Sequence, residues 1–469
     1  MRLLRLSFPR KRESSFFFSC FSKLEADSRL CGDEEQAKKI VGDPLDVFRS
    51  ARAKAVFRVR RLRIVAAALL VVPFAAHAVT TVRTVSERSC AALATRVDAI
   101  AGSAPIFLRS YDHEHGSGEP AEPALRTAAF TYDNALAVIA LLACERKAQA
   151  LRIGEALRIA ATGDARLRNV YRAGAVADKP LPNGWWDARE NRWVEDAYQD
   201  GTATGNVAWA ALALLALHDV TGDVRWRDAA AKLANWIVAN TADARGAGGF
   251  SGGIDGFDAA PKKILWKATE HNIDLAAMFA WLDRAGAPGD WKKYVKQASD
   301  FVAAQWDAAS GHFFVGTLPD GVTPNRSTSG LDAQLWAQLL ANARPEWRRA
   351  LTYVEREHAV PGGFDFNADR DGLWTEGTAQ VALVYRRLGR EADADKLFAT
   401  IAGQESPGGF FYATREPRIT TGLAIGGDST SADFYYYRRP HLGATAWATL
   451  AATRRNPFVP ATAPTAKRP

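Results

Sequence analysis

Residues 204–240 read TGNVAWAALALLALHDVTGDVRWRDAAAKLANWIVAN, and this stretch decides the kind of fold that the chain adopts. Apolar residues recur in both halves at steps of three and four residues, which is typical of helices. Thr221-Gly222-Asp223 separates the two halves and is typical of a tight turn. The stretch therefore predicts two helices, residues 204–219 and 225–240, that form an antiparallel hairpin.

The same helical pattern recurs along most of the chain, with almost no sustained alternation of the kind that marks strands. We predict twelve helices, at residues 86–101, 128–145, 147–161, 204–219, 225–240, 271–285, 291–307, 330–342, 346–358, 375–388, 391–403 and 441–453. Short turns join five pairs of these helices into hairpins. The first and last helices remain, and they can pair if the chain closes into a ring. Repeated helix pairs of this kind indicate a closed toroid or a solenoid.

The connections between hairpins are long, and each is rich in glycine and aromatic residues. They contain Asn183-Gly184-Trp185-Trp186, Gly248-Gly249-Phe250, Gly311-His312-Phe313-Phe314, Gly362-Gly363-Phe364 and Gly408-Gly409-Phe410-Phe411. Long loops without secondary structure are uncommon unless they serve a function. Because these loops recur at the same place in each unit, we expect them to gather on one face of the molecule.

Twelve helices in six hairpins, with loops entering one face, resemble the (α/α)6 barrel of the six-hairpin glycosidase superfamily. The resemblance covers residues 86–455 and implies an all-α fold in which residues 79–456 form a single barrel domain. The superfamily also contains epimerases and polysaccharide lyases. The resemblance therefore implies a carbohydrate substrate more firmly than it implies one reaction.

The first turns of the inner helices carry polar residues, and in such a barrel these turns line the cleft. They contain Tyr132-Asp133-Asn134, Thr204-Gly205-Asn206, Glu270-His271-Asn272, Asp332 with Gln334, Glu376 with Gln380, and Arg439-Pro440-His441. Helix capping explains some of these residues, because acidic and hydroxyl side chains satisfy the free N–H groups of a helix start. Six helix starts that all carry such groups also predict a convergent polar pocket.

Cleavage of a glycosidic bond requires one carboxylic acid and a second carboxylate on the other side of the sugar. Glu270 is the best candidate for the general acid, because it follows the apolar segment 264–267, which can raise its pKa. Asp133 and Glu376 are the leading candidates for the base, and Asp332 comes next. The resemblance implies an inverting mechanism.

Further residues are candidates for holding the sugar. Amide and imidazole groups that can bind hydroxyls are those of Asn134, Asn206, His271, Asn272, Gln380 and His441. Flat aromatic surfaces that can stack on sugar rings are those of Trp185, Trp186, Trp266 and Trp374. Trp209, Trp336 and Trp447 have helical spacing and are expected in the core.

No cofactor and no metal site are predicted. The chain has neither a P-loop nor a G-x-G-x-x-G motif after a strand, and its His and Cys residues lack the spacing of zinc ligands. Loop aspartates such as Asp365, Asp369 and Asp371 could bind Ca²⁺. They lack the spacing of an EF-hand and are more typical of turns.

The basic character of the chain comes from its first part. Of 469 residues 24% are charged, and the formal net charge is +8; residues 1–78 contain 16 of the 60 basic and 8 of the 52 acidic residues. The remaining residues are neutral overall, which argues against a nucleic-acid partner. Six basic residues between 52 and 63, an apolar run and Ala76-His77-Ala78 predict a signal peptide at residues 56–78 that is cleaved after Ala78.

These features predict an exported protein, either periplasmic or secreted. Residues 1–55 are interpreted as a mis-started or disordered leader and residues 457–469 as a disordered tail. Cys90 and Cys144 can form one disulfide in an oxidising compartment, or remain two buried thiols.

The sequence thus predicts a monomeric glycoside hydrolase with a carbohydrate substrate and no membrane association beyond the signal peptide. A polysaccharide lyase or sugar epimerase on the same fold is the first alternative. A carbohydrate-binding envelope protein without catalytic activity is the second.

Overall fold

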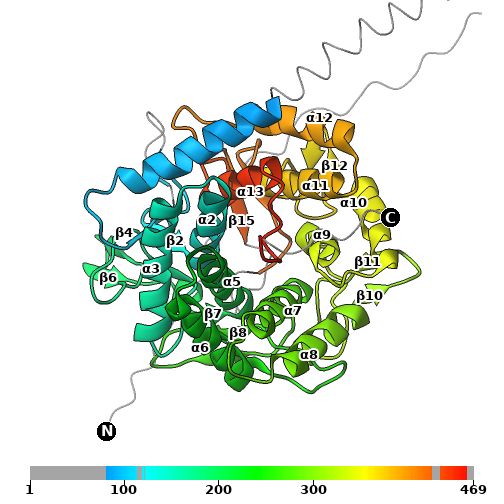
Figure 1. Ribbon diagram of the computed structural model, residues 1–469, viewed down its shortest axis with the longest axis horizontal. Coiled ribbons are helices and arrows are strands. Elements are labelled where there is room, and N and C mark those ends of the chain that lie inside the picture. Colours follow the sequence, from blue (N-terminus) through cyan, green and yellow to red (C-terminus); the bar gives the residue numbers. More distant parts are fainter. Residues whose placement is uncertain (1–80, 114–118, 121, 425–433, 462–469) are drawn as a thin grey trace, which may run out of the picture. The chain divides into compact units, whose positions relative to one another are not determined.

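The computed structural model describes residues 81–113, 119–120, 122–424 and 434–461 (Figure 1). The leader and signal-peptide predictions, residues 1–78, lie outside the described residues. None of the described helices is long and apolar enough to cross a membrane.

Six helices form an inner ring (Figure 1). They are α2 (Thr131–Ala143), α5 (Thr204–Thr221), α7 (Thr269–Arg284), α9 (Leu331–Leu339), α11 (Thr375–Arg387) and α13 (Leu442–Ala452). Each packs against the next, and α13 packs against α2, so the ring is closed. The predicted (α/α)6 barrel is therefore confirmed.

Outer helices cover this ring. They are α3 (Lys147–Gly163), α6 (Val224–Thr241), α8 (Trp291–Ala304), α10 (Arg349–Glu357) and α12 (Glu391–Ala402), and each packs against the inner helix that precedes it. A further helix covers residues 81–98 at the start of the described chain. Short helical turns complete the described helices: η1 (Pro123–Leu125), α4 (Ala197–Asp200) and η2 (Pro345–Arg348). The predicted bounds of the twelve long helices agree with the structure to within a few residues.

The burial of the helices follows their sequences. Every residue from Val207 to Leu217 in α5 is buried, as expected for a helix that is apolar on all sides. In α6, by contrast, only one face is buried, which includes Trp226, Leu233 and Ile237. An inner helix thus packs on all sides, whereas an outer helix leaves one face in water.

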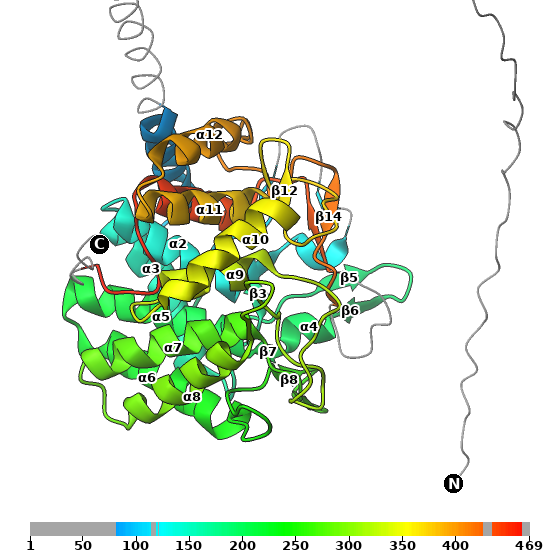
Figure 2. The ribbon, with the colours of Figure 1, turned by 90° about the vertical axis from the view of Figure 1, so that its right-hand side faces the viewer.

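Short strands of two or three residues pair with one another in the loops between helices. They are β1 (Ile106–Phe107), β2 (Ala128–Phe130), β3 (Val170–Arg172), β4 (Gly174–Ala175), β5 (Trp185–Asp187), β6 (Arg192–Val194), β7 (Thr202–Ala203), β8 (Gly253–Asp255), β9 (Lys262–Ile264), β10 (Trp306–Asp307), β11 (His312–Phe313), β12 (Ala359–Val360), β13 (Gly363–Phe364), β14 (Arg418–Thr420) and β15 (Tyr435–Tyr437). All their pairs are antiparallel; three strands form the sheet β7–β8–β9, and the others pair as β1–β4, β2–β3, β5–β6, β10–β11, β12–β13 and β14–β15. Figure 2 shows that many of them gather at one end of the barrel, which we call the loop face. These strands are too short to produce an alternating pattern in the sequence.

A repeated hydrogen bond connects each of five loops to the inner helix that follows it. A backbone N–H in the loop donates to an amide or hydroxyl oxygen in the first turn or so of that helix. The pairs are Leu108 with Asn134 (2.8 Å), Phe250 with Asn272 (2.9 Å), Phe313 with Gln334 (2.7 Å), Phe364 with Thr378 (3.1 Å) and Phe411 with Thr445 (2.9 Å). Such bonds satisfy buried backbone groups of the loops, which would otherwise destabilise them.

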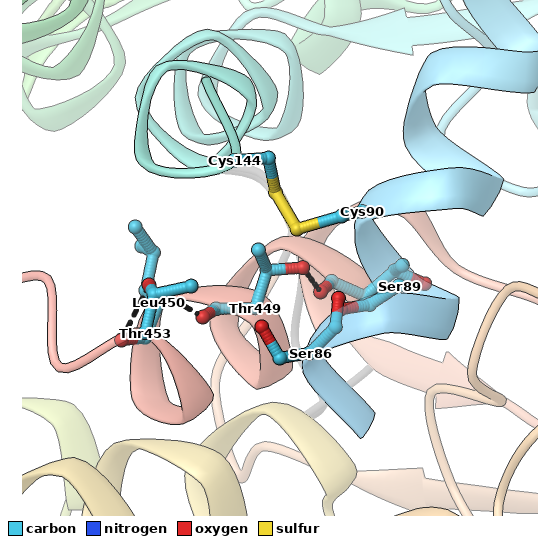
Figure 3. The surroundings of a disulfide bond; sticks show 8 residues. Ser86, Ser89, Cys90, Cys144, Thr449, Leu450 and Thr453 are labelled. Atoms are coloured by element: carbon cyan, nitrogen blue, oxygen red, sulfur yellow. Dashed lines mark hydrogen bonds between the residues drawn. A yellow bond between two sulfur atoms is a disulfide. The ribbon is translucent and has the colours of Figure 1, made fainter. Parts of the chain in front are cut away.

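A disulfide between Cys90 and Cys144 joins the helix of residues 81–98 to the end of α2 (Figure 3). The two Cα atoms are 5.7 Å apart, and the cysteines are 54 positions apart in the sequence. Of the two alternatives that the sequence left open, the structure therefore shows the disulfide.

An aromatic layer fills the inside of the ring. It consists of Tyr132, Trp209, Trp336, Trp447 and Phe458, whose neighbouring ring centroids lie 5.2–6.4 Å apart. The three tryptophans are buried, as expected.

Phe458 belongs to the segment after α13, which runs along the end of the barrel opposite the loop face (Figure 2). The boundary predicted at residue 456 is therefore too early, because Phe458 is buried against Trp209 and Trp336. The Asn456 amide donates to the carbonyl of Leu339 (2.7 Å) and anchors the same segment. Residues 462–469 of the predicted tail lie outside the described residues.

Candidate active site

Five carboxylates come from the beginnings of four inner helices. They are Asp133 on α2, Glu270 and Asp274 on α7, Asp332 on α9, and Glu376 on α11. Burial, and then the charges of Asp332, Asp274 and Glu376, raise the pKa of Glu270; burial, and then the charges of Asp133 and Asp332, raise that of Glu376. The structure thus brings all four predicted catalytic carboxylates into one group and adds Asp274.

Glu270 and Asp332 form a coupled pair within this group. Burial first, and then the charge of Asp332 and a hydrogen bond with it, raise the pKa of Glu270 well above its usual range. Burial also raises the pKa of Asp332. The Glu270 side chain is nevertheless 30% exposed, whereas the other four carboxylates are buried. Glu270 therefore combines a firmly held proton with access from outside, which a general acid requires.

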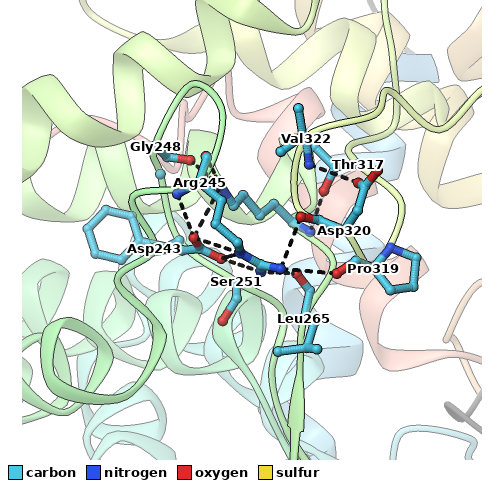
Figure 4. A network of polar contacts seen from close by, with 12 residues as sticks. Asp243, Arg245, Gly248, Ser251, Leu265, Thr317, Pro319, Asp320 and Val322 are labelled. Atoms are coloured by element: carbon cyan, nitrogen blue, oxygen red, sulfur yellow. Dashed lines mark hydrogen bonds and ion pairs between the residues drawn. The ribbon is translucent and has the colours of Figure 1, made fainter.

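A buried lysine just before α7, the helix that carries Glu270, binds the carbonyls of a neighbouring loop. The Lys267 side chain is fully buried, and its Nζ donates to the carbonyls of Arg245 (2.6 Å) and Gly248 (2.8 Å). The Arg245 guanidinium in turn donates to the carbonyls of Leu265 (2.7 Å) and Asp320 (3.0 Å). Arg245 thereby ties together the segments before and after α7 (Figure 4).

His271 and Asp274 lie beside Glu270 on the same helix. The His271 Nε2 atom is 3.5 Å from Oε1 of Glu270, and burial lowers the pKa of His271 to about 4. A Cβ on Gly205 would lie 2.4 Å from His271 Cδ2 and 3.3 Å from Asp274 Oδ2. Both side chains thus pack onto α5 at a position where only glycine fits. Asp274 is the carboxylate of the group that the sequence did not rank as catalytic.

Glu376 is held by Tyr132. The Tyr132 hydroxyl donates to Oε1 of Glu376 (2.6 Å) and accepts a hydrogen bond from Nε1 of Trp447 (2.8 Å). Burial raises the pKa of Glu376 well above its usual range. Oε2 of Glu376 is buried without a hydrogen-bond donor among the described residues. Glu376 therefore has one fixed oxygen and one oxygen that still lacks a partner.

His441 faces Asp133 while it caps α13. Its Nδ1 accepts the N–H of Ala444 (3.2 Å), so a neutral ring carries its proton on Nε2. Nε2 lies 3.4 Å from Oδ2 of Asp133. The rings of Tyr111 and Tyr436 flank the imidazole, with centroids 4.7 and 5.9 Å away. Capping and contact with a candidate catalytic residue are thus combined in one side chain.

Gly443 lets Asp133 and Glu376 approach the same point of α13. A Cβ at this position would lie 2.7 Å from Asp133 Oδ1 and 2.8 Å from Glu376 Oε2. Two carboxylates therefore touch the helix where a glycine leaves room.

Three of the four predicted amide ligands already have hydrogen-bond partners within the protein. Asn134 and Asn272 are fully buried, and both bond the loop backbone in the repeated contact described above, so their amides are not available to a sugar. Asn206 donates to Oδ1 of Asn169 (2.8 Å). Gln380 is buried one turn after Glu376, and neither polar atom of its side chain has a partner among the described residues.

The predicted aromatic platforms differ in their exposure. Trp374 is only 1% exposed and packs on Phe366 and Tyr436, so it offers no surface to a sugar, contrary to the prediction. Trp186 is 58% exposed on the hairpin β5–β6, and Trp185 lies beside it. Trp266 is half-buried, with its ring 5.8 Å from that of His271.

Comparisons with known proteins support the fold. No family model and no curated protein matches the chain. Among solved structures, a glycosidase matches with a TM-score of 0.55 and 13% identity, over 82% of this chain and 99% of its own. The cellobiose 2-epimerase of Spirochaeta thermophila matches with a TM-score of 0.54 and 15% identity, over 80% and 97%. A structure described as a novel alpha-amylase from Clostridium perfringens matches with a TM-score of 0.50 and 9% identity, over 78% and 97%. The closed ring of hairpins and these matches together show that the chain has an (α/α)6 barrel fold.

Proposed function

We propose that this protein is a glycoside hydrolase that cleaves an oligo- or polysaccharide by general acid/base catalysis. The observation that carries the proposal is the state of Glu270. This carboxyl group is accessible, has a raised pKa and lies within a group of four further carboxylates. The carbohydrate-active neighbours with the same fold support the substrate class.

In the proposed mechanism, Glu270 protonates the leaving oxygen of the glycosidic bond. Asp133 is the proposed base, because its Oδ2 lies 3.4 Å from Nε2 of His441, which can hold the carboxylate in position. Glu376 then holds the sugar or its attacking water through Oε2, its oxygen without a partner. Inversion is part of the proposal.

An epimerase is a second candidate, favoured by His271. The lowered pKa keeps this imidazole neutral at pH 7, with its Nε2 3.5 Å from Oε1 of the accessible Glu270. A lyase that uses Tyr132 as its base is less well supported. The Tyr132 hydroxyl already donates to Glu376, and burial raises its pKa well above 10.

We further propose that the protein is exported and works as a monomer in the periplasm or outside the cell. The disulfide between Cys90 and Cys144 supports an oxidising compartment.

The test compares wild-type protein with Glu270→Gln on a panel of neutral and acidic glycans. Glu190→Gln, in the exposed turn of the hairpin β5–β6, is the matched control. New reducing ends, near-ultraviolet absorbance and the ratio of epimers are followed together. We expect new reducing ends for the wild type and the control, and a loss of at least about 100-fold for Glu270→Gln, with its circular dichroism unchanged.

Each alternative gives a different result. Full activity of Glu270→Gln would contradict its role as the acid. Epimers without new reducing ends would indicate an epimerase, and absorbance from an unsaturated product would indicate a lyase. Sugar binding without turnover, unaffected by loss of the carboxylates, would indicate a binding protein.

A further inference from the structure

A second group of carboxylates lies outside the candidate active site. It consists of Asp365, Asp369 and Asp371, in the loop that connects β13 to α11. One carboxylate oxygen from each residue lies within 4.8 Å of the others. Three like charges that converge in this way repel one another unless something positive lies between them.

Asp365 is the buried member of this group. The residue has no exposed surface, and its Oδ1 accepts the N–H of Phe366 (2.7 Å). Its Oδ2 is buried and has no hydrogen-bond donor among the described residues. A buried carboxylate oxygen without a hydrogen-bond donor destabilises the folded chain. We therefore expect this oxygen to bind a partner that the described residues do not supply.

The other two members face solvent. Asp369 and Asp371 are both exposed, and Oδ2 of Asp371 accepts the N–H of Thr420 on β14 (2.9 Å). Asp365 therefore closes the inner side of the group, while its outer side is open to water. An ion can enter from that side and keep some of its waters.

The nearest cation in the sequence does not neutralise the group. Arg370 lies between Asp369 and Asp371, but its guanidinium donates to the carbonyls of Glu357 (2.8 Å) and Arg356 (2.7 Å). The chain thus leaves three carboxylates together and directs its adjacent positive charge elsewhere.

The donor set selects a class of metal ion. It offers only oxygen, and the three ligands come from a short loop whose backbone carbonyls can add to them. Calcium takes six to eight oxygen ligands in irregular geometry, whereas magnesium requires a near-octahedral shell and holds its waters. Softer metals prefer nitrogen and sulfur. We propose that Asp365, Asp369 and Asp371 bind a Ca²⁺ ion.

The position of the site gives the ion a structural effect. Glu376, in the first turn of α11, lies five positions after Asp371, and Asp371 also holds β14 through Thr420. A bound ion cross-links the loop between β13 and α11, and so fixes the backbone that leads to Glu376. We therefore expect calcium to raise the thermal midpoint.

The experiment is calorimetric titration of the EDTA-treated full chain with CaCl₂ and, separately, with MgCl₂. We expect the wild type to bind one Ca²⁺, and Asp365→Asn and Asp369→Asn to weaken binding by more than about tenfold. Asp365→Asn keeps an acceptor for the Phe366 N–H, and Asp369 is exposed, so both variants should fold, which circular dichroism verifies. Asp320→Asn, in another exposed loop, is the matched control and should bind like the wild type.

Glu270→Gln separates this site from the carboxylates of the candidate active site, and it should also bind calcium like the wild type. Three results would overturn the proposal: no calcium binding by the wild type, unchanged binding by both aspartate variants, or equal affinity for Mg²⁺. None of these readouts depends on enzymatic activity, so the proposal can fail or hold whatever reaction the protein catalyses.

Discussion

Replacing Gly443 by alanine tests whether the two carboxylates next to it are rigidly held. The new Cβ would lie 2.7 Å from Asp133 Oδ1 and 2.8 Å from Glu376 Oε2, whereas an ordinary contact begins near 3.4 Å. Both carboxylates must therefore move by about 0.6–0.7 Å. They cannot swing freely, because Tyr132 holds Glu376 and His441 faces Asp133 in a buried environment.

Two opposing effects set the expected stability. Overpacking of this kind costs about 1–3 kcal/mol. Alanine is favoured over glycine inside a helix by about 0.5–1 kcal/mol. We therefore expect Gly443→Ala to lower the free energy of unfolding by about 1–2 kcal/mol. A displacement of this size should also lower turnover at least about tenfold, because shifts of 1 Å can cost about 100-fold.

Urea unfolding, followed by circular dichroism, measures the first effect, and the glycan assay measures the second. Gly163→Ala is the matched control, because Gly163 lies in α3 with no atom within 4 Å of the added Cβ. This control should be as stable as the wild type or more stable. If Gly443→Ala matched the control in both stability and turnover, the close approach of Asp133 and Glu376 to α13 would be refuted.

Further predictions concern stability, pH and binding. Replacing Cys90 and Cys144 by serine should lower the free energy of unfolding by about 4 kcal/mol in the chain-entropy model for a loop of 54 residues, measured by urea unfolding; a loss under 1 kcal/mol would contradict it. The pKa of Glu376 is raised in the folded chain, so the folded chain holds this proton more tightly than the unfolded chain does. The contribution of Glu376 to the free energy of unfolding therefore falls as pH rises above about 4.5. Glu376→Gln should therefore gain stability relative to the wild type between pH 5 and pH 8, as measured by urea unfolding. If the difference in free energy of unfolding between the two proteins stayed the same across this range, the predicted pKa shift would be wrong. Phe458→Ala should cost about 3–5 kcal/mol, and a thermal midpoint equal to that of the wild type would show that the C-terminal segment is not packed. Trp186→Ala should leave the thermal midpoint unchanged but raise KM for long glycans, and an unchanged KM would remove this residue from the substrate path.

Much of the fold could be predicted because it depends on periodicity. Helix α5 is apolar on all sides and α6 on one side, and these patterns alone distinguish inner from outer helices. The ring closure followed from the first and last helices, which had no other partner.

The candidate site was harder to predict, because several roles use the same residue types. Asn272 and His271 are neighbours in the first turn of α7, yet the first bonds a loop backbone and the second lies beside Glu270. Sequence spacing cannot separate these roles, since the loop partner Phe250 is distant in the chain. The prediction for Trp374 was wrong for a similar reason: its position in a loop suggested exposure, but Phe366 and Tyr436 cover it.

The aromatic layer gives the barrel a floor. Because Phe458 and the tryptophans around it are buried inside the ring, the described residues leave no tunnel from one end of the barrel to the other. A sugar polymer could not be threaded lengthwise through such a ring. Under the proposed function it would instead approach the carboxylates from the loop face, the end at which the inner helices begin.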